Sequence, residues 1–407
     1  MNRKAQLLLV LSGLLVVIAV SQAIPSVLRT TVSTREITIP FELINRQIIL
    51  KVKVGDSRPF SFVLDTGAQM AIINLDRAKE LGLRLQGAVR MGGAGPETPT
   101  GAFVREASFT VLGLPAFSQP VKLALPLANL APRAGHDFDG IIGSEFIQEF
   151  VVEVDYQARV LKLHDKAKFT YSGSGQSIPI QLTHGHPILT AEVTPVNGQP
   201  LKGRFVLDLG SSLALALHSP FIEEHRLLGP DLKTIRSLGG LGAGGKTVGR
   251  VGRVSELKIG TFRINNPITL FSEDKAGAFA STALAGNIGA QVASKFRVFL
   301  DYERSRIILE PNSNYSSPFD RAFAGLSLVA EGKDYSTFRV REILEDSPAS
   351  EVDMQVDDII VAINGKPASE LTLSNLNEML ERPVTYGLIV RRGEQTLRIA
   401  LTPRRLI

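Results

Sequence analysis

The chain has 407 residues, of which 44% are hydrophobic and 21% are charged, and its formal net charge is +5. This length predicts two or three globular domains, and the modest charge, carried by scattered basic residues, argues against nucleic acid as a partner. The sequence contains no cysteine, which excludes disulfides, thiolate catalysis, cysteine-ligated zinc and a cysteine-linked lipid anchor.

The first element, residues 1–23, has the pattern of an export signal. Arg3 and Lys4 precede an apolar run over residues 7–20, and small residues follow at the place of a cleavage site. An apolar helix of that length would reach roughly 21 Å, which is short of the ~30 Å hydrocarbon core of a bilayer. We therefore expect a cleaved signal peptide, with an uncleaved membrane anchor as the alternative. Both interpretations predict an exported protein, periplasmic or extracellular.

An internal repeat follows. Residues 37–68 and 176–211 both contain an Ile-Pro pair, an alternating strand pattern, a turn and the sequence Phe-Val-Leu-Asp. Further segments that begin at Gly140 and Gly286 also match each other, in the same order and at nearly the same spacing. Two ordered matches indicate a duplicated unit.

Within each copy, short β-branched runs alternate with Gly, Pro and Asn. This pattern predicts two mostly-β lobes, residues 36–170 and 175–313. Helical patterns are brief, and the clearest one, over residues 75–81, follows the capping residue Asn74.

A carboxylate stands at the end of an apolar strand in each copy. Asp65 is followed by Thr66 and Gly67, and Asp208 is followed by Leu209 and Gly210. Two such carboxylates that face each other cannot both ionise easily, so they share one proton. One can then activate a water molecule while the other protonates a carbonyl oxygen, which is general acid–base hydrolysis.

These features resemble the pepsin-like and retropepsin-like aspartic proteases, and the resemblance covers roughly residues 36–313. It implies a bilobal acid-protease fold, a peptide or protein substrate, and Asp65 and Asp208 as the catalytic pair. Four residues would support the two catalytic loops: Thr66, Gly67, Gly210 and Ser211. In the family an apolar-apolar-Gly element threads beneath each loop, and the matching segments here are Ile141-Ile142-Gly143 and Asn287-Ile288-Gly289.

The sequence departs from this family at the second loop. Leu209 stands where the family has Thr or Ser, so we expect one hydrogen bond between the loops to be missing. The residue after each glycine also differs, being Ala68 in the first copy and Ser211 in the second. A hydroxyl that bonds a carboxylate favours its charged form, so we expect an asymmetric pair in which Asp65 holds the proton.

A β-hairpin flap over the cleft is another feature that the resemblance implies. Its expected place is residues 90–103, where Gly92, Gly93 and Gly95 would supply mobility. The segment has no Tyr to match the flap tyrosine of pepsin-like enzymes, and an ordinary glycine-rich surface loop is the alternative.

The C-terminal quarter resembles a PDZ domain, residues 321–407, after a polar linker over residues 312–320. A helix over residues 373–380 and a hairpin turning at Arg392-Gly393 would complete this α+β domain. Its carboxylate-binding loop would be formed by Gly325, Leu326, Ser327 and Leu328. A C-terminal peptide ligand is therefore the expected partner. The alternative is a packing module without a ligand.

Two other patterns have ordinary explanations. Residues 240–247 satisfy a phosphate-loop pattern, but neither the strand nor the apolar helix that it requires flanks them. His184 and His186 alternate across a turn without a third metal ligand nearby, so we expect a solvent-facing pair. The sequence therefore predicts neither a metal ion nor a cofactor.

Together these patterns predict an exported aspartic endopeptidase with a PDZ domain. One alternative is a non-catalytic peptide-binding protein with a degenerate second lobe. Another keeps catalysis but uses Asp65 from two chains of a dimer.

Overall fold

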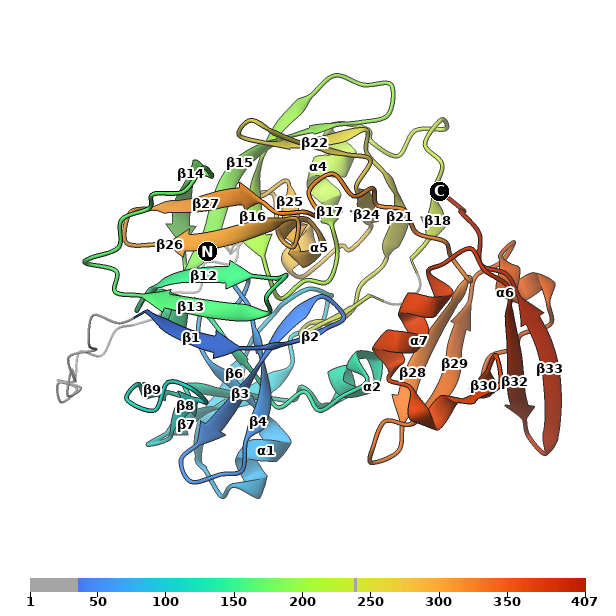
Figure 1. The fold of residues 1–407 in the computed structure, drawn as a ribbon, viewed down its shortest axis with the longest axis horizontal. Helices are drawn as coiled ribbons and strands as arrows, with labels where there is room; N and C mark the ends of the chain where they lie inside the picture. The colour runs from blue at the N-terminus through green and yellow to red at the C-terminus, as the bar shows by residue number, and fades with distance from the viewer. Residues whose placement is uncertain (1–35, 238–239) are drawn as a thin grey trace, which may run out of the picture.

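The computed structural model describes residues 36–237 and 240–407 (Figure 1). The expected signal peptide or membrane anchor lies outside these residues. The chain is mostly β, with 44% of its residues in strands and 12% in helices. None of the helices within the described ranges is both long and apolar enough to cross a membrane. The predicted fold class, two β lobes followed by an α+β domain, is confirmed.

The first lobe is built around a ten-stranded sheet in the order β6-β7-β10-β5-β11-β4-β3-β8-β9, with β2 beside β3. Its strands are β2 (Glu42–Ile44), β3 (Gln47–Val54), β4 (Phe60–Leu64), β5 (Ile72–Asn74), β6 (Arg84–Arg90), β7 (Thr100–Arg105), β8 (Ser108–Val111), β9 (Gln119–Pro120), β10 (Leu123–Leu125) and β11 (Gly140–Ile142).

The second lobe repeats this plan. Its strands are β14 (Gln176–Thr183), β15 (His186–Thr194), β16 (Leu201–Asp208), β17 (Leu215–Leu217), β18 (Ile235–Arg236), β19 (Leu241–Gly242), β20 (Gly245–Lys246), β21 (Gly249–Arg253), β22 (Glu256–Ile259), β23 (Phe262–Asn265), β24 (Ile268–Ser272) and β25 (Gly286–Gly289). The duplication is visible in the pairing, because β11 runs parallel to β4 and β25 runs parallel to β16.

A shared sheet joins the two lobes. The first lobe contributes β1 (Ile37–Pro40), β12 (Val151–Asp155) and β13 (Val160–His164), and the second contributes β14, β26 (Phe296–Asp301) and β27 (Arg306–Pro311). The lobes meet where β12 pairs antiparallel with β26. Because one hydrophobic cluster extends through both lobes and this sheet, the lobes form a single body.

Short helices close several strand ends. They are α1 (Leu75–Glu80), α2 (Ala131–Ala134), α3 (Ser144–Ile147), α4 (Ser219–Glu224) and α5 (Ala290–Ala293), with 3-10 turns η1 (Ala128–Leu130) and η2 (Ala278–Ala280). The side chain of Asn74 accepts a hydrogen bond from the Asp76 amide and caps α1, as the sequence predicts.

The C-terminal domain has its own hydrophobic core and a six-stranded sheet. Its elements are β28 (Leu326–Glu331), β29 (Thr337–Ile343), α6 (Pro348–Glu351), β30 (Ile359–Ile363), β31 (Lys366–Pro367), η3 (Ala368–Glu370), α7 (Leu373–Leu380), β32 (Tyr386–Arg392) and β33 (Gln395–Leu401). The predicted helix and final hairpin are both present.

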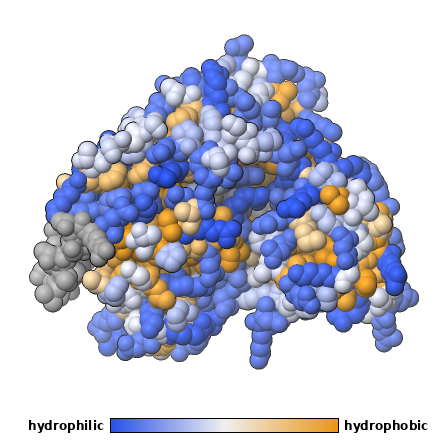
Figure 2. Space-filling model, in the orientation of Figure 1, coloured by the Kyte–Doolittle hydropathy of each residue, from blue (hydrophilic) through white to orange (hydrophobic). Residues whose placement is uncertain are grey.

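The linker between the second lobe and this domain is held in place. Lys295 donates hydrogen bonds from Nζ to the carbonyls of Asn314 (3.1 Å) and Tyr315 (3.3 Å), and the Tyr315 ring packs against Phe296. Most of the surface in Figure 2 is hydrophilic, whereas hydrophobic side chains gather over the C-terminal domain and beside the boundary between the first lobe and the shared sheet.

Candidate active site

Asp65 and Asp208 lie at equivalent places in the two lobes. Asp65 follows β4 and Asp208 is the last residue of β16. The neighbouring parallel strands fix these ends, because the Asp65 amide donates to the Ile142 carbonyl at 2.9 Å and Asp208 is in register with Gly289. The sequence repeat thus brings the two predicted catalytic residues together.

The two carboxyl groups lie close together, because a Cβ added to Gly67 would be 3.0 Å from both Cγ of Asp208 and Oδ1 of Asp65. The Gly67 amide donates to Oδ1 of Asp65 at 2.7 Å, and the Ser211 amide donates to Oδ1 of Asp208 at 3.1 Å. Burial, followed by the charge of Asp208, raises the pKa of Asp65 well above its ordinary value. A carboxyl that keeps its proton beside a second carboxyl group is an arrangement that can serve general acid–base hydrolysis of an amide.

Thr66 ties the first loop to the second lobe. Its buried hydroxyl donates to the Leu207 carbonyl at 2.5 Å and accepts from the Leu209 amide at 2.9 Å. Leu209 returns no side-chain bond, and its side chain is fully buried in the core. A second tie is made by Gln47, whose side-chain amide donates to the Gly210 carbonyl at 2.5 Å.

The apolar-apolar-Gly elements lie against the loops that contain Asp65 and Asp208. A Cβ on Gly143 would come within 2.6 Å of the Met70 backbone, and one on Gly289 would lie 2.3 Å from the Leu213 carbonyl oxygen. Side chains at these two positions would therefore push the loops away.

The environment of Asp208 contains a residue whose role the sequence does not predict. Asn287 donates from Nδ2 to Oδ2 of Asp208 at 2.8 Å, and its Oδ1 lies 3.0 Å from Nε2 of His218. The Ser211 hydroxyl instead accepts a long bond of 3.4 Å from the Leu213 amide. Asn287 thus donates the side-chain hydrogen bond to Asp208 that we expected from the Ser211 hydroxyl. The sequence indicates this residue only through its polarity, because the matching position of the first copy is Ile141.

His186 also lies nearer the site than expected. His184 is exposed, but His186 is half-buried and lies against the backbone of Thr66. Burial lowers the pKa of His186, and the Thr66 backbone and the Asp208 charge oppose this effect without overcoming it. The expectation of a solvent-facing pair is therefore wrong for His186, because this first residue of β15 lies near the backbone of Thr66.

The expected flap region is a hairpin formed by β6 and β7, with residues 91–99 at its tip. The tip meets the β19–β20 hairpin of the second lobe, since the Glu97 amide donates to the Gly244 carbonyl at 2.7 Å and the Gly244 amide donates to the Ala94 carbonyl at 2.9 Å. A Cβ on Gly93 would lie 3.0 Å from that of Ala243, so these tips pack closely. Gly92 makes no such close approach, because its nearest neighbour is Thr98 in the same tip.

In the C-terminal domain, β28 is the edge strand of its sheet, followed by β29. Gly325 has a φ of +80° and precedes it, whereas Leu326, Ser327 and Leu328 lie within the strand rather than in a loop. The helices α7 and α2 lie beside β28, α2 coming from the first lobe (Figure 1).

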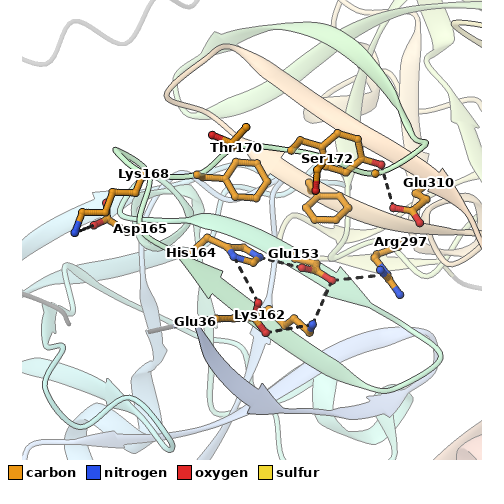
Figure 3. A pocket seen from close by; sticks show the side chains of 14 residues that line it. Glu36, Glu153, Lys162, His164, Asp165, Lys168, Thr170, Ser172, Arg297 and Glu310 are labelled. Carbon is orange, nitrogen blue, oxygen red and sulfur yellow. Dashed lines mark hydrogen bonds and ion pairs between the residues drawn. The ribbon is translucent and has the colours of Figure 1, made fainter. Parts of the chain in front are cut away.

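A polar pocket of about 470 Å³ lies on the shared sheet and is not lined by the catalytic carboxyls (Figure 3). Glu153 on its floor is buried and accepts a bond of 2.9 Å from Nε2 of His164. Lys162 and Arg297 lie 4.0 and 3.7 Å from the same carboxylate. The positive charges of Lys162 and Arg297 compensate the negative charge of Glu153, which explains why this carboxylate can be buried here without a ligand. In the described ranges we find no group of three or more His, Asp or Glu arranged to hold a metal ion.

Comparison with known families identifies both parts of the chain. Residues 50–146 and 191–290 match the aspartyl protease family, and residues 339–385 match the PDZ domain family. The two lobes form an aspartyl protease unit of the retropepsin-like family, and a PDZ domain follows it. The two matched stretches of the protease unit contain Asp65 and Asp208 respectively.

Individual proteins resemble one part or the other. Serine protease HTRA1 of Xenopus laevis is 32% identical over 65 residues, which are 16% of this chain and 14% of that protein. The structure of the HtrA3 PDZ domain bound to a phage-derived ligand (FGRWV) covers 21% of this chain and 86% of its own, at 27% identity and a TM-score of 0.19.

Two solved structures cover the protease unit. The aspartic proteinase from Irpex lacteus is 12% identical, covers 70% of this chain and 99% of its own, and has a TM-score of 0.44. Basic 7S globulin from soybean is 10% identical, covers 70% of this chain and 97% of its own, and has a TM-score of 0.42.

Proposed function

We propose that this protein is an aspartic endopeptidase in which Asp65 and Asp208 activate water. The observation that carries the proposal is the close pair of carboxyl groups from equivalent strand ends of the two lobes, with a raised pKa at Asp65. Asp208 accepts a proton from water while that water attacks the peptide carbonyl, and Asp65 gives its proton to the carbonyl oxygen. The tetrahedral intermediate then collapses, the C–N bond breaks, and the amine leaves with a proton from the dyad.

The substrate is an extended peptide segment between the catalytic loops and the flap. The two hairpin tips hydrogen-bond to each other in the described structure, so a protein substrate enters only when they separate. The hydrogen bonds from Thr66 across the lobes support a dyad formed within one chain rather than by a dimer.

The test is peptide cleavage by the wild type, by Asp65→Asn and by Asp208→Asn, with active-site-inhibitor binding measured in parallel. Loss of cleavage in both variants supports the dyad within one chain, and loss in Asp65→Asn alone supports a dimer. A wild type that binds peptides but cleaves none at any pH identifies a non-catalytic peptide-binding protein.

The PDZ domain is proposed to bind a peptide carboxyl terminus along β28, as the ligand-bound HtrA3 domain suggests. Export is proposed from the N-terminal pattern alone, with a periplasmic or extracellular location. N-terminal sequencing of protein recovered outside the cytoplasm tests export: a new terminus near residue 24 supports a cleaved signal, and retention of the full chain in the cytoplasm contradicts export.

A further inference from the structure

The second lobe contains a polar chain that the first lobe lacks. Asn287 of β25 bonds Asp208 on one side and His218, the residue before α4, on the other. At the matching places the first lobe has Ile141 and Asn74, and Asn74 bonds the Phe138 carbonyl and the start of α1 instead. The two copies therefore differ at the two positions whose side chains form the chain of hydrogen bonds to Asp208.

The orientation of the Asn287 amide determines its effect on Asp208. A side-chain amide can present either its oxygen or its NH₂ group to a carboxyl, and only the NH₂ group stabilises the charged form. The structure turns the NH₂ group of Asn287 toward Asp208 and its oxygen toward Nε2 of His218, and in this arrangement Nε2 is the donor because the oxygen can only accept.

The surroundings of His218 keep it a neutral donor. The residue is 1% exposed and its ring lies against that of Phe279, with centroids 5.4 Å apart. Burial lowers the pKa of His218, which favours the uncharged imidazole. Its ring thus donates one hydrogen bond without bringing a second charge to the site.

We propose that Asn287 and His218 are positioning residues that hold Asp208 charged, so that Asp208 serves as base and Asp65 as acid. The ionisable groups that face Asp208 are Asp65 and His186. This inference deepens the proposed function, since it assigns the two carboxyls their roles. Its first test nevertheless needs no catalysis.

The experiment titrates the carboxyl pair by ¹³C NMR of labelled aspartate, with signals assigned through Asp65→Asn and Asp208→Asn. In Asn287→Ile the pair loses a donor to its charged oxygen, so its first proton comes off at higher pH than in the wild type. His218→Phe moves the same step in the same direction, and His218→Gln, which keeps a donor, restores it. Asn74→Ser is the matched control in the first lobe, and we expect no change.

An unchanged first step in Asn287→Ile overturns the proposal, whether or not the wild type is active. In an active enzyme we also expect kcat of Asn287→Ile to fall about 10-fold with KM nearly constant, because a hydrogen bond to a charged group is lost. A wild type without cleavage that still shows the NMR shift would contradict the proposed function and not the positioning role.

A separate observation concerns the PDZ domain, whose edge strand β28 faces the first lobe. The helix α2 lies beside β28 and near α7 (Figure 1). Gly135, at the end of α2, packs so closely that an added Cβ would lie 2.6 Å from Cβ of Leu373. The Tyr335 hydroxyl donates to Oδ1 of Asp137 at 3.1 Å.

Glu342 of β29 connects this contact to both lobes. Its carboxylate lies 3.7 Å from the guanidinium of Arg133 in the first lobe and 2.9 Å from Nζ of Lys246 in the second. Lys246 belongs to the β19–β20 hairpin, whose Gly244 bonds the flap tip. The PDZ domain therefore contacts both the first lobe and the hairpin of the second lobe that meets the flap tip.

We infer that the open edge of β28 is a docking surface for residues 131–137 of the first lobe, and that a peptide carboxyl terminus competes for it. Peptide addition to β28 requires the space that α2 occupies. A bound peptide therefore separates the PDZ domain from Arg133 and Lys246 and frees the hairpin tips.

The test uses the full chain and the peptide FGRWV with a free or an amidated carboxyl terminus. The variant Tyr335→Phe combined with Glu342→Gln weakens the docked contact, so we expect it to bind the free-acid peptide about fivefold or more tightly than the wild type. Hydrogen exchange in α2 and β28 should rise in the variant, while exchange in β33 stays constant. Equal peptide binding by the two proteins, including none by either, overturns the inference.

Discussion

Gly210 of the second catalytic loop lies directly against the carboxyl group of Asp65. A Cβ built on Gly210 would be 2.3 Å from Cγ of Asp65, whereas one built on Gly67 would be 3.0 Å from Cγ of Asp208. Both distances are shorter than ordinary van der Waals contact, and the first is much the shorter. The two glycines that look equivalent in the sequence are thus unequal in the structure.

We therefore expect Gly210→Ala to damage catalysis more than Gly67→Ala does. Displacing Asp65 by an ångström lowers kcat by about 100-fold, since catalysis depends on the position of the reacting groups. Gly67→Ala requires a smaller shift and should retain more activity. Steady-state kinetics with one peptide substrate compares them, and a Gly67→Ala variant that is equally impaired would contradict this ranking.

The hydrogen bonds of Thr66 between the lobes predict another difference between the two loops. Thr66→Val removes a hydrogen-bond partner from the Leu207 carbonyl and from the Leu209 amide, which costs about 1–3 kcal/mol for each group that is left unsatisfied. Leu209→Thr loses apolar burial but adds a hydroxyl that can bond the first loop, so it should cost less and keep activity. Urea unfolding of both variants measures the difference, and a greater loss in Leu209→Thr would show that apolar packing holds the loops together.

Much of this site follows from the sequence repeat, and the reasons for the exceptions are physical. Asp65 and Asp208 end matched strands, so a duplicated fold brings them together. The roles of Asn287 and His218 depend on hydrogen bonds whose direction only the packed side chains define. In the sequence they appear only as two polar positions at which the copies differ. Their importance becomes visible only when the strands are paired in register.

The docking of the PDZ domain is harder to predict. The Tyr335–Asp137 bond joins residues that are 198 positions apart, and it depends on how two separately folded units come together. Local patterns determine strands, turns and caps within each unit, such as the left-handed Asp357 with its φ of +73°. They contain little information on which surfaces of two finished units will meet.

The raised pKa of Asp65 predicts how stability depends on pH. A carboxyl whose pKa is higher in the folded state contributes stability that is complete below the unfolded value, 3.8, and is lost as the pH rises through the folded value. Asp65→Asn removes this loss of stability. The Tm of the variant minus the Tm of the wild type should therefore increase from pH 3 to pH 7. Thermal unfolding across that range measures it, with the exposed turn variant Asp56→Asn as the control. A constant Tm difference would contradict the burial of a protonated Asp65.

The contact between the hairpin tips predicts a switch that can be engineered. Because the chain has no cysteine, Gly93→Cys with Ala243→Cys introduces a unique pair. A Cβ added to Gly93 would lie 3.0 Å from that of Ala243, and a disulfide prefers about 3.8 Å, so a small outward shift is enough. Under oxidising conditions the linked tips should block entry of a protein substrate, and a reductant should restore cleavage. The single variants control for the substitutions themselves. Full activity of the cross-linked protein toward a folded substrate would show that the tips need not separate, and the flap would then lie elsewhere.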